Sequence, residues 1–180
     1  MGWFSPVKGS YPSLAQVDKT LPVDDSITEL ERGMIVTLGK DADGKPVWKL
    51  PAGTEKVLYV ALQGLSDPTA GFAGTAFDPK GGAPAITGID LAQDGEYETS
   101  VFDPAGSYEI GKALYVNNKG VLTTSTSGST IVGYVTQTPA SRWINNAIAV
   151  PDQKKYGPTD PRLAIRTGSR EKVIRFKTAL

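Results

Sequence analysis

Residues 112–135 read KALYVNNKGVLTTSTSGSTIVGYV, and this stretch decides the fold class. Two runs, Ala113–Val116 and residues 121–125, are rich in β-branched and aromatic residues and flank the turn sequence NNKG. An Asn/Gly turn between two such runs predicts a β-hairpin. A third run, residues 130–136, carries Gly133 in its middle, which predicts a bulge or a tight bend inside a strand.

The same pattern continues upstream of this hairpin. Residues 34–38 and 46–50 flank the turn sequence DADG at residues 41–44, which predicts a second hairpin. Residues 56–63, KVLYVALQ, are β-branched and aromatic and predict a central strand. Further strands are predicted at residues 86–91 and 96–102. The chain is therefore expected to be all-β, with a small β-barrel-like or β-sandwich domain over residues 33–136.

Long flanking segments surround this predicted domain. Residues 1–32 are predicted to form an extended N-terminal arm, because prolines interrupt it and its aromatic residues follow no strand or helix period. Near its end, residues 26–29 match a helix capping box, while a strand running from Ile27 into residues 34–38 is the competing interpretation. Residues 64–85 hold eight Gly or Pro in twenty-two positions and predict a long surface loop that packs on a neighbour.

The C-terminal extension, residues 137–180, is predicted to be basic from residue 151. Residues 151–180 hold eight Lys or Arg against three acids, so this part carries +5 and the rest of the neutral chain −5. One further strand is predicted within residues 142–150. Residues 172–177 are strand-like and could add to an exposed sheet edge. We expect the extension to make protein–protein contacts, with no direct binding of nucleic acid.

The composition excludes several classes of chemistry. The chain has no Cys and no His, which excludes disulfides, thiolate chemistry, nearly all structural zinc sites and the usual general base near neutral pH. The absence of a long apolar run and of a signal-peptide layout predicts a soluble chain made in the cytoplasm, with no membrane partner. No catalytic residue, metal or cofactor is predicted.

Three motifs imitate functional sites. Residues 106–112 have the spacing of a phosphate-binding loop, but Ala113 replaces the required Ser or Thr and a strand follows, so a turn is favoured. Residues 41–44 begin like a calcium loop, but Lys45 and Pro46 break the pattern, so a hairpin turn is favoured. Glu96 and Glu98 could form the carboxylate pair of a glycosidase, but a solvated sheet face is favoured.

The run from residue 112 to 135 resembles the small head-decoration (cement) proteins of tailed bacteriophages. Residues 33–38, GMIVTL, the Asp43-Gly44 turn and residues 57–62 fit the same pattern, and the resemblance covers residues 33–136. It implies a compact β-barrel-like domain without an active site on the outside of the capsid shell. It also implies dimers or trimers, and terminal arms that bind capsid subunits. The loop at residues 64–85 and the 44 residues after Thr136 exceed a minimal family domain.

The resemblance implies two partners, the major capsid protein and further copies of this chain, with the virion as the location. The alternatives are another β-rich virion component (a head fibre, tail or base protein) or a carbohydrate-binding β-module. Aromatic, arginine and other apolar groups outside the main strands are the predicted interface with the capsid or with another copy. These residues are Trp3, Phe4, Tyr11, Leu14, Phe72, Phe77, Trp143, Arg166, Arg170, Ile174 and Phe176.

Overall fold

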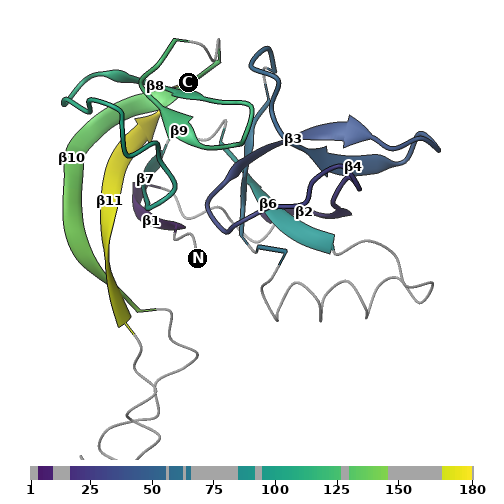
Figure 1. Ribbon diagram of the computed structural model, residues 1–180, viewed down its shortest axis with the longest axis horizontal. Coiled ribbons are helices and arrows are strands. Elements are labelled where there is room, and N and C mark those ends of the chain that lie inside the picture. Colours follow the sequence, from purple (N-terminus) through teal and green to yellow (C-terminus); the bar gives the residue numbers. More distant parts are fainter. Residues whose placement is uncertain are drawn as a thin grey trace, which may run out of the picture.

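The protein is all-β, as the sequence predicts. The computed structural model describes residues 4–9, 17–55, 57–62, 64–65, 85–91, 95–126, 130–145 and 168–179. These ranges contain no helix and form two antiparallel sheets, one of them curled into a half-barrel. Figure 1 shows the two sheets side by side, with β10 and β11 bowed along one flank.

The six-stranded sheet has the order β1-β7-β11-β10-β8-β9. Its strands, in chain order, are β1 (Phe4–Gly9), β7 (Gly95–Thr99), β8 (Ala113–Val116), β9 (Leu122–Thr123), β10 (Ile131–Asn145) and β11 (Gly168–Thr178). The sheet therefore combines the first strand of the chain with the last. Because β11 lies between β7 and β10, both of these strands have a neighbour on each side and neither is left as an edge.

The five-stranded sheet has the order β2-β6-β5-β3-β4. Its strands are β2 (Val17–Pro22), β3 (Ile35–Lys40), β4 (Pro46–Lys49), β5 (Tyr59–Ala61) and β6 (Ala85–Asp90). Just after β2, Val23 forms a parallel bridge with Trp48 of β4, and the Asp24 amide donates to the Trp48 carbonyl at 3.0 Å. The chain just after β2 thus meets the other outer strand, β4, so the sheet curls around a barrel-like interior.

Trp48 fills the interior of this barrel. Its side chain is fully buried, its indole Nε1 donates to the Ile86 carbonyl at 2.9 Å, and its ring lies 5.0 Å from that of Tyr59. Gly88 leaves room for the Trp48 ring, because a Cβ at this position would lie 2.6 Å from that ring. We call this cluster the barrel core; it also contains Val23, Ile27, Leu30, Val36, Ala61 and Ile86.

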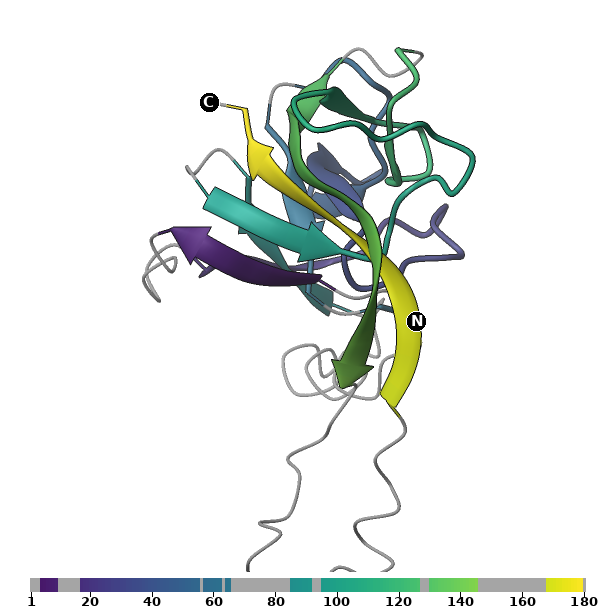
Figure 2. The same ribbon diagram turned by 90° about the vertical axis from the view of Figure 1, so that its left-hand side faces the viewer.

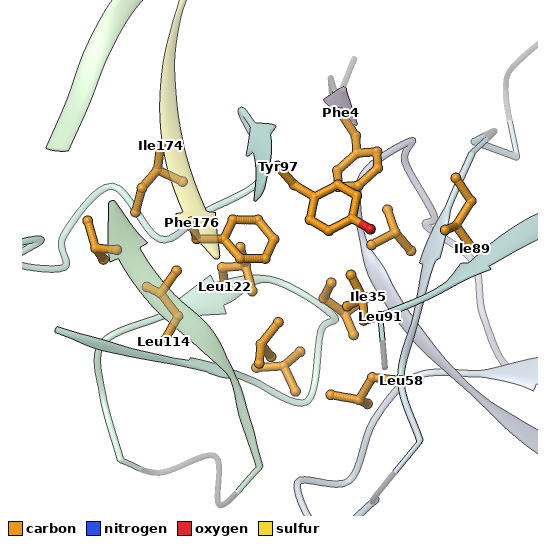
Figure 3. Close-up of a cluster of buried hydrophobic side chains, with 14 of the residues drawn as sticks. Phe4, Ile35, Leu58, Ile89, Leu91, Tyr97, Leu114, Leu122, Ile174 and Phe176 are labelled. Atoms are coloured by element: carbon orange, nitrogen blue, oxygen red, sulfur yellow. The ribbon is translucent and has the colours of Figure 1, made fainter. Parts of the chain in front are cut away.

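A second and larger core lies between the two sheets (Figure 3). It takes Phe4, Tyr97, Leu114, Leu122, Ile174 and Phe176 from the six-stranded sheet and Ile35, Val60 and Ile89 from the five-stranded one. We call it the inter-sheet core. Strand β5 serves both cores, since Val60 faces this one while Tyr59 and Ala61 face the barrel. Burial on both faces explains why residues 58–61, LYVA, are continuously apolar.

The prediction of a separate N-terminal arm is wrong for the residues that the structure describes. β1 pairs with β7 and β2 pairs with β6, and Phe4 is buried against Tyr97 with ring centroids 5.2 Å apart. Prolines misled the sequence argument, because they are tolerated in edge strands and β1 is the edge of its sheet. Residues 26–33 contain neither the capping-box helix nor the strand; the Asp24 carboxylate instead accepts the Ser26 amide at 3.0 Å in a turn.

The predicted hairpins are confirmed. β3 pairs with β4 around a turn in which the Asp41 carboxylate accepts the Asp43 and Lys45 amides and Gly44 has φ 80°. β8 pairs with β9 around the NNKG turn. The predicted bulge at Gly133 is also present, as an irregularity in the pairing of β10 with β8. No side chain fits at this position, because a Cβ would lie 2.2 Å from the Lys177 carbonyl oxygen.

The C-terminal strand is confirmed, but its partner differs from the expectation. β11 does not add to an exposed edge; it lies inside the six-stranded sheet, between β7 and β10. Residues 142–145 form no separate strand either, since they are the end of the fifteen-residue β10. The predicted start of the C-terminal extension at residue 137 therefore falls inside the continuous strand β10.

Candidate interaction surface

The end of the β10–β11 ladder projects beyond the rest of the sheet. β8 pairs with β10 only from Ile131 to Tyr134, and β7 pairs with β11 only from Ile174 to Lys177. Beyond these contacts the two long strands continue together, below all other strands in Figures 1 and 2. We call residues 141–145 with residues 168–172 the stem, and residues 131–140 with residues 173–178 the base.

Stem and base differ in the regularity of their pairing. The stem contains five consecutive pairs, from Ser141 opposite Lys172 to Asn145 opposite Gly168, with no irregularity. The base contains two irregularities, between Val135 and Gln137 and between Gln137 and Ala140, each of which adds one residue to β10. Bulges of this kind bend a strand and increase its local twist. They lie where the ladder leaves the sheet, so they set the direction of the stem.

The backbone register of the stem gives the pairs of residues that lie opposite each other. Ile174 and Phe176 belong to the inter-sheet core, so alternation places the exposed Lys172 on the same face of β11. Its register partner is Ser141, which is also exposed. Further along the ladder, Glu171 pairs with Arg142 and Arg170 pairs with Trp143.

The outer face of the base is closed by internal pairing. The Glu98 carboxylate, only 4% exposed, accepts from both Nε and Nη2 of Arg175, which lies opposite it in the ladder. Two strand positions away, the Thr136 hydroxyl donates to the Glu96 carboxylate at 2.5 Å. The expected solvated face is therefore wrong for Glu98. Each carboxylate accepts hydrogen bonds from a different partner within the sheet. This arrangement does not suit the acid and base of a glycosidase.

The other two imitation motifs are structural turns. Tyr108 in the phosphate-loop imitation is buried, and its hydroxyl donates to the Asp103 carbonyl at 2.7 Å. Burial and the Asp103 carboxylate raise the pKa of Tyr108 to about 12. β8 follows, where a phosphate loop needs a helix. The calcium-loop imitation is the β3–β4 turn, in which backbone amides use the Asp41 carboxylate.

One apolar surface accompanies β8 and β10 on their outer side. Tyr134 is 44% exposed and Ile131 is also exposed, while Tyr115, the register partner of Ile131, is half-buried. Leu114 and Val116 face the core, so alternation places Tyr115 on the same outer side as Tyr134. We call these three residues the tyrosine face. The sequence argument predicted the strands that carry these residues but did not assign them to an exposed face.

The predicted interface residues separate into three groups. Phe4, Ile174 and Phe176 are wrong as interface residues, since they are buried in the inter-sheet core of their own chain. Trp143 and Arg170 lie opposite each other on the stem. The remaining predicted residues lie outside the part of the chain that the structure describes; they are Trp3, Tyr11, Leu14, Phe72, Phe77 and Arg166.

Metal-binding clusters and membrane-spanning helices are both absent from the residues that the structure describes. These residues contain no group of three or more His, Cys, Asp or Glu side chains placed to hold a metal ion. In the same residues, no helix has the length and apolar character to cross a membrane. Comparison with family models, with curated proteins and with solved structures found no match to this chain.

Proposed function

We propose that this chain is a structural protein without enzymatic activity. It binds the outer surface of a phage capsid and stabilises the shell by bridging major capsid protein subunits. The observation that carries the proposal is the stem, a two-stranded ladder that leaves its own sheet. A two-stranded ladder is marginally stable alone in water, and its outward edges present unpaired backbone groups. Such an element is suited to binding a partner.

The body behind the stem supports this role. β10 and β11 are held in the base between β8 and β7, and Val135, Ile174 and Phe176 anchor them in the inter-sheet core. The second sheet curls around Trp48. A stem anchored in this way can transmit force between the surfaces that it joins. Many such weak contacts, repeated around a closed shell, add up by multivalency.

The use of the polar side chains also favours a structural role. The groups whose types suggested chemistry each have a structural partner: Glu98 pairs with Arg175, Glu96 with Thr136, and Tyr108 with a backbone carbonyl. The resemblance of residues 33–136 to head-decoration proteins points to the same class.

The test is to locate the chain in particles purified from the source of this sequence. Mass spectrometry should find it in fixed stoichiometry with the major capsid protein, and cryo-electron microscopy should show it on the outside of the shell. Density in a tail, base or head fibre instead would favour the other virion roles. A chain that does not copurify with particles contradicts the proposal.

A second candidate function, carbohydrate binding, is favoured by the tyrosine face. Sugar-binding surfaces use aromatic rings on one sheet face, and Tyr115 and Tyr134 lie on one face of neighbouring strands. A glycan array with the wild type and with the Tyr134→Ala variant tests this function. Glycan binding that disappears in the variant would favour it over the capsid role.

A further inference from the structure

We infer that residues 23–30 form a lid over the barrel core, and that this lid opens in acid when the Asp24 carboxylate gains a proton. The lid is the first part of the irregular stretch that joins β2 to β3. The inference goes beyond the proposed function, because it concerns a conformational change within the chain and needs no contact with a capsid.

Three apolar side chains of the lid belong to the barrel core. Val23, Ile27 and Leu30 are buried, although residues 25, 26, 28 and 29 between them are exposed. The three lie in the same cluster as the fully buried Trp48, and Val23 forms a backbone bridge with it. A lid that lifts therefore removes three side chains from the cluster and exposes part of the Trp48 environment to water.

The two ends of the lid are held by different kinds of contact. At its C-terminal end, the Leu65 amide donates to the Leu30 carbonyl at 2.9 Å, and a Cβ on Gly64 would lie 2.8 Å from the same oxygen. These contacts involve backbone atoms and do not titrate. At its N-terminal end, the Asp24 amide donates to the Trp48 carbonyl, and the Asp24 side chain reaches the same edge strand, β4. Only this end of the lid therefore depends on a carboxylate.

The Asp24 carboxylate joins the turn of the lid to β4. It accepts the Ser26 hydroxyl at 2.5 Å, the Ser26 amide at 3.0 Å and the Lys49 ammonium at 3.2 Å. The Lys49 side chain lies over β3, since a Cβ on Gly39 would lie 2.6 Å from Lys49 Cδ. Among the described residues, Lys49 is the one charged side chain that contacts Asp24, and the neighbouring Asp25 is exposed.

The direction of the acid response follows from these donors. Hydrogen bonds from the Ser26 hydroxyl and amide, and then from Lys49, lower the pKa of Asp24 from 3.8 to about 2. In a lifted lid the carboxylate returns to water and to its ordinary pKa. The charged carboxylate therefore favours the closed lid at any pH above its ordinary pKa, and this advantage is lost as the pH falls towards about 2. The inter-sheet core shares no side chain with the lid, so the six-stranded sheet can stay folded while the lid is open.

The experiment is hydrogen exchange on the full chain, measured by mass spectrometry and expressed as protection relative to the unfolded chain at each pH. We expect the protection of residues 24–27 to fall at least about fivefold between about pH 5 and pH 2.5, while β11 keeps its protection. Asp24→Asn keeps the shape of the side chain without its charge, so it should show the weakened protection already at pH 5. The matched control is Asp25→Asn, which removes an exposed carboxylate one residue away and should behave as the wild type.

Fluorescence of Trp48 gives an independent measurement of the opening. The chain has three tryptophans, so the Trp3→Phe/Trp143→Phe background leaves Trp48 as the one indole. Quenching of its fluorescence by acrylamide should increase as the pH falls and should be higher in Asp24→Asn at pH 5. Lys49→Met keeps most of the apolar stem and removes the ammonium, and it should lower the protection of residues 24–27 at pH 5 by less than Asp24→Asn does.

Three results would overturn the inference. The first is protection of residues 24–27 that does not change between about pH 5 and pH 2.5 in the wild type, a result that needs no variant to fold. The second is a loss of protection in the lid and in β11 at the same pH, because the whole chain then unfolds together. The third is an Asp25→Asn variant that opens the lid as much as Asp24→Asn does. None of these measurements involves a capsid, so the inference and the proposed function can fail independently.

Discussion

The two halves of β11 have the same backbone conformation but different surroundings. In the base, β11 has a strand on each side, and Ile174 and Phe176 are buried in the inter-sheet core. In the stem, the only strand paired with residues 168–172 in the described ladders is β10, and the alternating positions are charged or small. One strand thus serves stability at one end and presents a surface at the other. Substitutions in the base should change the free energy of unfolding, and those in the stem should change binding to a partner.

The largest effect should follow from Phe176→Ala in the base. The ring is fully buried and lies 6.0 Å from that of Tyr97, and its removal leaves a cavity between the sheets. We expect a loss of about 3–5 kcal/mol in the free energy of unfolding, measured by urea denaturation. Arg170→Ala, in the stem of the same strand, is the control and should change this energy by less than about 0.5 kcal/mol. Equal losses in both variants would remove the distinction between the two halves.

A smaller loss is expected from Arg175→Met, also in the base. This change leaves the Glu98 carboxylate buried without the guanidinium that pairs with it. Removing one partner of a fully buried pair costs about 3–5 kcal/mol, and the partial exposure of Arg175 reduces our expectation to about 2 kcal/mol. The double variant Glu98→Leu/Arg175→Met should recover at least half of the loss. A double variant less stable than Arg175→Met would contradict this account of the pair.

Thr136→Val should have a still smaller effect. The change keeps the shape of the side chain and removes the hydroxyl that donates to Glu96. A hydrogen bond to a charged group contributes about 1.5 kcal/mol, and the partial exposure of both residues places the expected loss near 1 kcal/mol. Ser141→Ala removes a hydroxyl from an exposed position of the stem and should leave the unfolding midpoint unchanged. If both variants lose the same amount, the Thr136 bond has no special role.

Local patterns predicted the hairpins, and long-range pairing decided the rest. The β3–β4 and β8–β9 hairpins could be predicted because turn residues and strand residues lie within one short window. The pairing of β1 with β7 and of β7 with β11 joins residues 75 to 95 positions apart in the chain, and no local pattern encodes it. Phe4 was therefore assigned to an interface, although it lies in the core.

The stem shows the same limit for the candidate site. Trp143 and Arg170 could be selected one by one as groups that interfaces favour. That they lie opposite each other in one ladder follows from the register of β10 and β11, which two bulges in β10 shift by two residues. The two added residues cancel in the alternation of β10, so the pattern of the sequence does not reveal the shift in register. For the same reason, the sequence argument did not predict that the base holds the C-terminal extension in the sheet.

The smallest effect on stability should come from Arg170→Ser with Lys172→Ser in the stem. Both residues lie beyond the last residue pair of β11 with β7, and Lys172 is exposed. We expect the unfolding free energy to stay within about 0.5 kcal/mol of the wild type, while binding to capsid shells weakens severalfold and loses much of its salt dependence. Urea titration and cosedimentation with shells, carried out on the same samples, measure both quantities. A loss above about 1 kcal/mol would mean that the stem is part of the folded body, and its cations would then have to be explained by stability and not by a partner.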